Sequence, residues 1–180
     1  MAEFQIDQFC GGVFQTNGYL LRYAGKAWLF DAPEGVTGWL EEKGVRPDGL
    51  ILTHQHHDHV LDAGLVQERF GCPLYAYAEP SDELTLSKQL ELMMGMPCPI
   101  DLYTIDHILA GQSALSLEGL SLDLLHIPGH SPDSLCFHIQ GQPVVIAGDV
   151  LFNGSIGRTD FPNGSHEQLI SGIREKLWPL

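Results

Sequence analysis

The chain has 180 residues, of which 44% are hydrophobic, and this suits one globular domain with a sizeable core and excludes a disordered chain. Nine basic and 23 acidic residues give a net charge of −14, so the protein's field repels phosphate backbones and we expect no nucleic-acid partner. No stretch approaches the roughly 18 apolar residues that a membrane span needs, so no membrane partner is expected either.

The first half of the chain is predicted to alternate between strands and helices. A helix is expected over Val36–Lys43, because its apolar residues have helical spacing and Gly44 can end it. A second helix is expected over residues 62–70, ending at Gly71. Apolar runs bounded by turn residues predict five strands. These strands cover residues 4–9, 17–23, 26–32, 49–53 and 73–77.

The second half begins with a helix-like segment, residues 81–97, whose end carries Met93, Met94 and Met96. These methionines have two possible roles, as part of a flexible lid over a substrate or as ordinary core residues. Strands are then predicted over residues 115–117, 120–127, 135–139 and 144–147. The last helix is predicted over residues 165–177, where Ser165 and Gln168 form a capping box and Leu169, Ile170, Ile173 and Leu177 line one face.

This order of elements favours an α/β (α+β) fold in which two packed sheets carry helices on the outside. The chain stops at "KLWPL", directly after the last helix, where such a sandwich is expected to continue. We therefore predict a single domain over residues 1–180 that lacks its C-terminal segment. The four cysteines form no CxxC pair and the N-terminal residues do not resemble a signal peptide, which favours a cytoplasmic protein with reduced thiols.

A histidine-rich motif follows the predicted strand at residues 49–53. The stretch "THQHHDH" places His54, His56, Asp58 and His59 within six positions. Imidazole nitrogens and carboxylate oxygens together suit zinc, iron or manganese. Because these side chains follow a rigid strand and the chain then turns into a helix, they can face the same ion. The motif therefore predicts a metal site.

Two later segments have the form of further ligands. His130 lies in "HIPGHSPDS", a turn after a strand, and we interpret "SPDS" as the turn that positions it. Asp149 follows the apolar strand of "VVIAGDVLF", where a carboxylate is costly unless it is paired or bound to metal. Among the other histidines, His57 is expected to point away from the metal and His126 to form a hydrogen bond. His107 and His138 are expected to be ordinary sheet or loop residues.

The motifs "THQHHDH", "PGHSPDS" and "AGDVLF" resemble, in order, those of the metallo-β-lactamase fold hydrolases. Residues 154–180 look like the small single-domain subgroup related to glyoxalase II, the hydroxyacylglutathione hydrolases. This resemblance implies an αβ/βα four-layer sandwich with the site at one edge between the sheets. It also implies a first metal site made by His54, His56 and His130, a second made by Asp58 and His59, and a bridging carboxylate, Asp149.

The resemblance implies zinc-dependent thioester hydrolysis, with one or two metals bound and with iron or manganese as alternatives. Two metals require a late histidine that this sequence does not contain. Zinc lowers the pKa of bound water from 15.7 to about 7, which provides hydroxide to attack the thioester carbonyl. Asp58 is the candidate catalytic residue, because it can orient the water or relay a proton. Arg158 matches a basic residue that meets glutathione in related enzymes.

Two alternatives remain open from the sequence. Persulfide dioxygenases resemble the chain as well, including the stretch "GRTDF", and would use one iron held at His54, His130 and Asp149. A shortened relative that keeps one metal as a structural ion would have no catalytic activity. Metal content and oxygen uptake distinguish these alternatives from a hydrolase of small-molecule thioesters.

Overall fold

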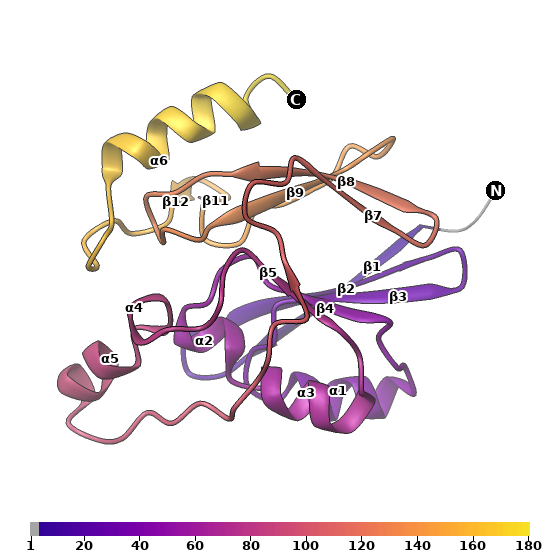
Figure 1. The fold of residues 1–180 in the computed structure, drawn as a ribbon, viewed down its shortest axis with the longest axis horizontal. Coiled ribbons are helices and arrows are strands. Elements are labelled where there is room, and N and C mark those ends of the chain that lie inside the picture. Colours follow the sequence, from indigo (N-terminus) through magenta and orange to yellow (C-terminus); the bar gives the residue numbers. More distant parts are fainter. Residues whose placement is uncertain (1–3) are drawn as a thin grey trace. The chain divides into compact units, whose positions relative to one another are not determined.

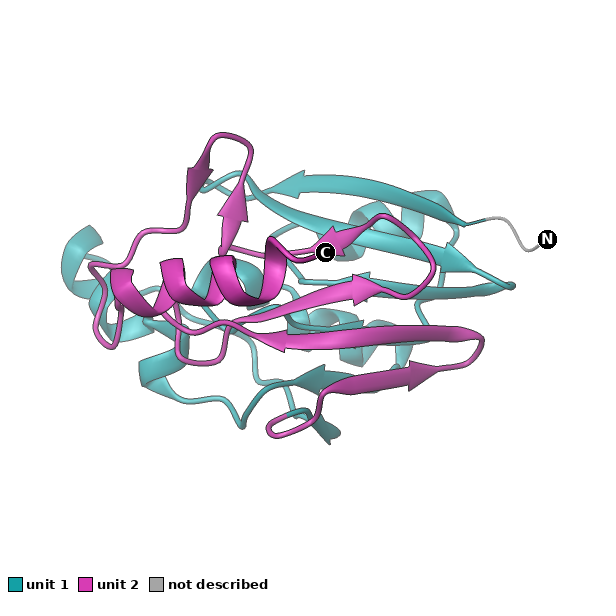
Figure 2. Cartoon of the chain, turned by 90° about the horizontal axis from the view of Figure 1, so that it is seen from above, with its two compact units in different colours: residues 1–109 teal, residues 110–180 magenta. Residues whose placement is uncertain are grey.

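The computed structural model describes residues 4–180 (Figure 1). Their contacts divide the chain into two compact units, which Figure 2 colours separately. Unit 1 ends at Leu109 and unit 2 begins at Ala110. No helix within residues 4–180 is long and apolar enough to cross a membrane.

Unit 1 is built on a six-stranded sheet in which the strands are neighbours in sequence order. Strands β1 to β3 pair antiparallel, and β3 to β6 pair parallel. The strands are β1 (Gln5–Gly11), β2 (Thr16–Tyr23), β3 (Lys26–Phe30), β4 (Gly49–Ile51), β5 (Leu74–Ala76) and β6 (His107–Ile108). Antiparallel neighbours can be joined by short turns, whereas parallel neighbours need long crossover connections. The helices of unit 1 lie in these connections, between the parallel strands.

The helices between the parallel strands cover a hydrophobic core. Helix α1 (Val36–Lys43) and helix α3 (Ala63–Phe70) bury Val36, Leu40 and Val66 against strand residues such as Leu29 and Leu50. Both helices end at a glycine with positive φ, Gly44 and Gly71, as the sequence predicts. A short helix, α2 (His57–Val60), starts earlier than expected, inside the histidine motif.

The methionine-rich segment does not fill the core. It forms α4 (Asp82–Thr85) and α5 (Ser87–Met94), and none of the eight α5 residues, all of which are described, is buried. Met93 is 67% exposed, Met94 49% and Met96 56%. The prediction that these side chains fill the core is therefore wrong.

Unit 2 contains a four-stranded antiparallel sheet in the order β10-β9-β8-β7 and a small hairpin. The sheet strands are β7 (Ala114–Leu117), β8 (Leu120–His126), β9 (Leu135–Ile139) and β10 (Val145–Ile146), and the hairpin pairs β11 (Leu151–Phe152) with β12 (Ser155–Ile156). These positions agree with the predicted strands to within two residues at each end. The hairpin was not predicted.

The last helix has the predicted extent but an irregular end. Helix α6 (His166–Gly172) continues into a π-helical turn, η1 (Ile173–Leu177). Ser165 caps it, because its Oγ accepts a hydrogen bond of 3.3 Å from the Gln168 amide. Leu169 and Ile173 are buried against Ile127 and Cys136, so the predicted apolar face packs on the unit 2 core.

Candidate metal centre

The structure gathers three imidazoles of unit 1 just after strand β4. The ring centres of His54 and His56 are 4.6 Å apart, and those of His54 and His59 are 4.1 Å apart. All three side chains are buried. Burial of three adjacent imidazoles is costly unless their nitrogens are used, and a metal ion uses them well.

A buried carboxylate that the sequence analysis missed orients this cluster. Asp31 follows strand β3, and its Oδ2 accepts a hydrogen bond of 2.9 Å from His59 Nδ1. Its two oxygens also accept hydrogen bonds from the Thr53 amide, at 2.7 Å, and from the Thr53 hydroxyl, at 2.8 Å. An aspartate directly after an apolar strand is the signal that identified Asp149, and the same signal marks Asp31.

These hydrogen bonds fix which ring nitrogen carries the proton. A carboxylate only accepts, so His59 Nδ1 must donate to Asp31. The Thr53 hydroxyl gives its hydrogen to Asp31, so its oxygen accepts at 3.1 Å from His54 Nδ1. In both histidines the lone pair therefore lies on Nε2. Nitrogen donors oriented in this way through their other ring nitrogen fit a divalent metal.

Asp58 lies beside the same cluster. The Thr16 hydroxyl, at the start of strand β2, donates to Asp58 Oδ2. That oxygen is 3.6 Å from His59 Nε2, so a carboxylate oxygen and an imidazole nitrogen that could both bind a metal lie next to each other. The donor set of unit 1 thus contains both oxygen and nitrogen, which suits zinc, iron or manganese.

His57 has a different contact, in agreement with the prediction that it points away from the metal. Its Nε2 lies 3.2 Å from the Cys98 carbonyl oxygen, which only accepts a hydrogen bond. This bond ties the segment that follows α5 to the histidine motif. The histidine motif and the methionine-rich segment are therefore joined by a hydrogen bond within unit 1.

Unit 2 contains a second group of candidate ligands. His130 Nε2 is 3.5 Å from Asp149 Oδ2, and His130 Nδ1 donates a 2.8 Å hydrogen bond to the Arg158 carbonyl. The proton is again on Nδ1 and the lone pair on Nε2. Residues 131–134, which follow His130, form the expected turn, because the Ser134 amide bonds to the Ser131 carbonyl at 3.3 Å. That this turn positions His130 stays a prediction.

Gly157 is packed against both of these candidate ligands. A Cβ added at Gly157 would lie 1.8 Å from the Asp149 carbonyl oxygen and 3.0 Å from His130 Nδ1. We expect Gly157→Ala to destabilise the protein by about 1–3 kcal/mol, because backbone must shift to admit the methyl group. Metal binding should weaken in parallel. Thermal unfolding and metal titration measure both effects.

The control for this substitution is Gly38→Ala, in helix α1, where a Cβ meets nothing within 4 Å. Alanine is favoured over glycine in a helix by up to about 1 kcal/mol, so this variant should be as stable as the parent or more stable. Equal stability of the Gly157 and Gly38 variants would contradict the packing argument.

The side chain of Arg158 is engaged within unit 2. Its Nε and Nη2 each donate a 2.7 Å hydrogen bond to Asp160, and its guanidinium carbon lies 4.1 Å from the centre of the Phe161 ring. The guanidinium lowers the pKa of Asp160 to about 2. A substrate carboxylate at Arg158 would therefore compete with the carboxylate of Asp160.

Three other histidines, His107, His126 and His138, have the ordinary roles expected of them. His126 Nε2 lies 2.8 Å from the Pro132 carbonyl oxygen. His138 Nδ1 lies 2.8 Å from Asp123 Oδ2. The His107 ring stacks on Tyr75 with ring centres 4.4 Å apart.

The sequence and the structure match known proteins over nearly the whole chain. The family model of the metallo-beta-lactamase superfamily matches residues 11–179. The "Probable metallo-hydrolase YqgX" of Bacillus subtilis (strain 168) is 34% identical, over 94% of this chain and 82% of its own length. The "Hydroxyacylglutathione hydrolase GloC" of Haemophilus influenzae (strain ATCC 51907 / DSM 11121 / KW20 / Rd) is 40% identical, over 78% of this chain and 67% of its own length.

A solved structure agrees with these relatives. The crystal structure of BLEG-1 B3 metallo-beta-lactamase has a TM-score of 0.87 and 32% sequence identity, covering 98% of this chain and 87% of that one. The expected fold class is confirmed by this likeness. On the family match, the sequence relatives and the shared fold, the chain belongs to the metallo-β-lactamase superfamily.

Proposed function

We propose that the protein is a metal-dependent hydrolase of small-molecule thioesters of the S-acylglutathione type. The observation that carries the proposal is the tautomer shared by His54, His59 and His130. In each, Nδ1 donates to an oxygen and the lone pair remains on Nε2. Family membership implies a metal, and these nitrogens are suited to hold it.

The proposed ligand set follows the likeness to the family. His54, His56 and His130 would form the first metal site, Asp58 and His59 the second, and Asp149 the bridge. Zinc is the proposed metal, with iron and manganese as alternatives. When bound, such a metal supplies a Lewis acid and lowers the pKa of a water molecule toward neutrality.

The protein's own side chains would position the reactants. Thr16 holds Asp58 by donating to Oδ2, so the other oxygen, Oδ1, can orient a water molecule or accept its proton. Asp31 keeps His59 in one ring orientation. A thiolate leaves readily, so thioester cleavage needs no strong general acid from the chain.

The proposed substrate class is supported by one relative and by one expected contact. The relative from Haemophilus influenzae is named a hydroxyacylglutathione hydrolase. Arg158 would meet the glutathione portion of the substrate, exchanging its contacts with Asp160 for those with a glutathione carboxylate. We also propose that the protein acts in the cytoplasm on small molecules and has no nucleic-acid or membrane partner.

Metal content and reaction together test this proposal. Purified protein should contain zinc, or another divalent metal, and should hydrolyse S-lactoylglutathione, measured by the release of free thiol. Chelation should abolish that hydrolysis, and addition of the metal should restore it. One iron per chain with oxygen consumption on glutathione persulfide would instead establish a dioxygenase. One metal with neither activity would establish a structural ion.

A further inference from the structure

A buried glutamine of the histidine motif closes the base of a long segment of unit 1. Gln55 Nε2 donates a 2.9 Å hydrogen bond to the Ala78 carbonyl, and Gln55 Oε1 accepts a 3.0 Å hydrogen bond from the Tyr103 hydroxyl. The exposed fraction of Gln55 is 0%. Residues 79–102, here named the arm, therefore begin and end at a side chain that lies between proposed metal ligands in the sequence.

A second hydrogen bond from the histidine motif holds the far part of the arm. His57 Nε2 donates to the Cys98 carbonyl at 3.2 Å, and the Cys98 amide donates to Glu91 Oε1, also at 3.2 Å. Glu91 belongs to helix α5, so the helix and the loop that follows it are linked to the motif together. Because consecutive Cα atoms are about 3.8 Å apart, the Cα atoms of Met96 and Cys98 are separated by less than about 8 Å. The methionine-rich part of the arm therefore lies beside the histidine motif.

The position of helix α5 is fixed at a strained residue. Leu86, at the junction of α4 and α5, has a φ of 56°, in the left-handed region that favours glycine, and it is only 2% exposed. Such a conformation persists only where the surrounding structure holds it, and it is frequent at ligand-binding sites. Burial of the leucine side chain holds the junction here. Helix α5 is thus anchored to unit 1 although none of its own residues is buried.

The exposed surface of the arm is apolar. Within residues 4–109, nine large hydrophobic side chains are exposed, and five of them lie in the arm. These five are Leu92, Met93, Met94, Met96 and Leu102, with exposed fractions between 49% and 98%. Residues 92–100 contain no charged side chain, in a chain with a net charge of −14. A concentration of exposed apolar side chains marks a surface that binds a ligand or a partner.

We propose that the arm binds the acyl group of the substrate, so that the protein prefers thioesters with an unbranched apolar acyl group, such as hexanoyl, over the polar lactoyl group. This inference rests on the proposed hydrolysis of S-acylglutathiones, in which water cleaves the C–S bond to give a carboxylic acid and glutathione. Glutathione carries two carboxylates and an ammonium group, so the acyl group is the part of the substrate that suits an uncharged surface. Methionine side chains are flexible and polarizable, which lets them adapt to alkyl chains of different length.

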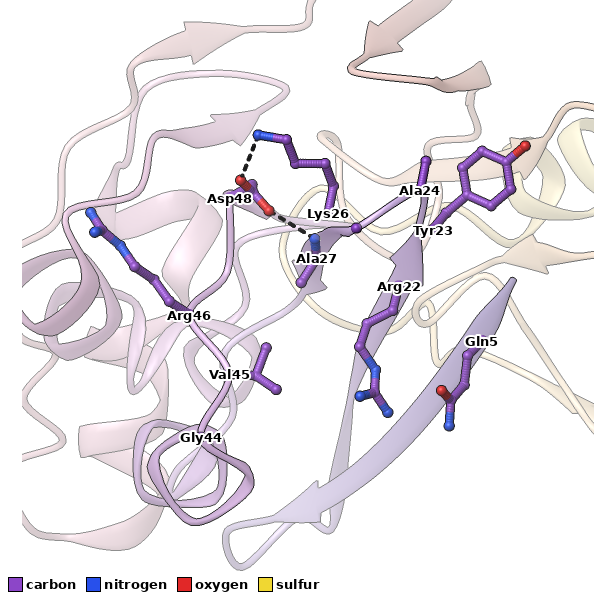
Figure 3. A pocket seen from close by; sticks show the side chains of 11 residues that line it. Gln5, Arg22, Tyr23, Ala24, Lys26, Ala27, Gly44, Val45, Arg46 and Asp48 are labelled. Carbon is purple, nitrogen blue, oxygen red and sulfur yellow. Dashed lines mark hydrogen bonds and ion pairs between the residues drawn. The ribbon is translucent and has the colours of Figure 1, made fainter. Parts of the chain in front are cut away.

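A second copy of the chain is the other occupant that an apolar surface could have. A contact between copies does not need attachment to a metal-binding motif, whereas Gln55 and His57 attach the arm to the histidine motif. The pocket drawn in Figure 3 is a poorer site for an alkyl chain, since the charged residues Arg22, Lys26 and Arg46 line it. The arm is therefore the better candidate for binding an apolar acyl group.

Binding of two non-hydrolysable thioethers tests the arm separately from catalysis. Zinc-loaded, ¹⁵N-labelled protein is titrated with S-hexylglutathione and with S-methylglutathione, which differ only in the alkyl chain. We expect S-hexylglutathione to bind about tenfold more tightly, because burial of its additional CH₂ groups is favourable. It should also shift the amide signals of residues 91–98. Equal affinities, or hexyl-specific shifts only at the pocket residues 22–27 and 44–46, would overturn the proposal.

Combining Met93→Gln, Met94→Gln and Met96→Gln should remove this difference in affinity. Glutamine is unbranched and similar to methionine in size but polar, and all three positions are exposed, so the variant should remain folded. Its kcat/KM for S-hexanoylglutathione should fall by about tenfold, and by much more than its kcat/KM for S-lactoylglutathione. Leu65→Gln is the matched control, because Leu65 is 40% exposed on helix α3 and lies outside the arm. Both rates should be unchanged in the control.

The outcomes separate this inference from the proposed function. If the parent hydrolyses both thioesters and the triple variant lowers both rates equally, or neither, the acyl-binding role is refuted and the hydrolase stands. If neither thioester is hydrolysed while S-hexylglutathione still binds at the arm, the hydrolase is refuted and the apolar binding surface stands. A change from dimer to monomer in the triple variant, seen by sedimentation and without loss of the hexyl preference, would establish a contact between copies instead.

Discussion

Replacing His56 with alanine should abolish thioester hydrolysis while the protein remains folded. His56 is a proposed ligand of the first metal site, and even changes to groups that only orient a ligand cost about 10- to 100-fold in affinity or activity. We therefore expect a loss of more than about a hundredfold in kcat/KM. The fold should survive, because the contact that His56 makes with helix α2 uses its backbone carbonyl, which bonds the His59 amide at 2.9 Å.

The measurement is the rate of S-lactoylglutathione hydrolysis, with circular dichroism and thermal unfolding to establish that the variant is folded. His107→Ala is the control, since His107 lies in the same unit but stacks on Tyr75 at the edge of the sheet. Full thioester hydrolysis in His56→Ala would contradict the role of His56 as a ligand of the hydrolytic metal. Oxygen consumption on glutathione persulfide that survives in His56→Ala would instead favour a persulfide dioxygenase, which by resemblance does not use this position as an iron ligand.

Replacing Asp31 with asparagine should weaken metal binding by about 10- to 100-fold. Asparagine tolerates the φ of 60° at this position and can still accept from the Thr53 amide. If its oxygen stays on the Thr53 amide, its NH₂ group takes the place of Oδ2, the oxygen that accepts from both the Thr53 hydroxyl and His59 Nδ1. His59 would then lose the acceptor that fixes its tautomer.

Competition with a coloured chelator measures the metal affinity of this variant. Asp106→Asn is the matched control, because Asp106 also accepts a backbone amide bond, from Leu74 at 2.9 Å, but contacts none of the histidines of the motif. If both variants bind metal as the parent does, Asp31 does not orient the site. If both weaken equally, the effect is a general loss of stability.

The candidate ligands of unit 1 were predictable from sequence because they are local. His54, His56, Asp58 and His59 lie on one short segment, and an apolar strand precedes them. Asp31 was missed because its role depends on non-local pairing. Strand β3 pairs with β4 so that Phe30 lies opposite Ile51, and this register places Asp31 beside Thr53. A single sequence does not reveal which strands pair or in which register.

The second half shows the same limit in another form. The capping box predicted the start of helix α6 correctly, because a cap depends on residues only three positions apart. The π-helical turn at its end was not predicted from propensity. There the Lys176 side chain donates a 2.6 Å hydrogen bond to the His126 carbonyl, fifty residues away in the chain. Contacts of that separation leave no local pattern in the sequence.

The outward position of the methionines has a consequence for chemical ageing. Met93, Met94 and Met96 are the methionines among residues 4–180, and all are exposed, so neither core contains a thioether. Burial raises the pKa of Cys72 to about 11 and of Cys136 to about 12, which keeps both thiols protonated and poorly reactive. Peroxide would therefore convert surface thioethers to sulfoxides while the packed interiors stay chemically intact.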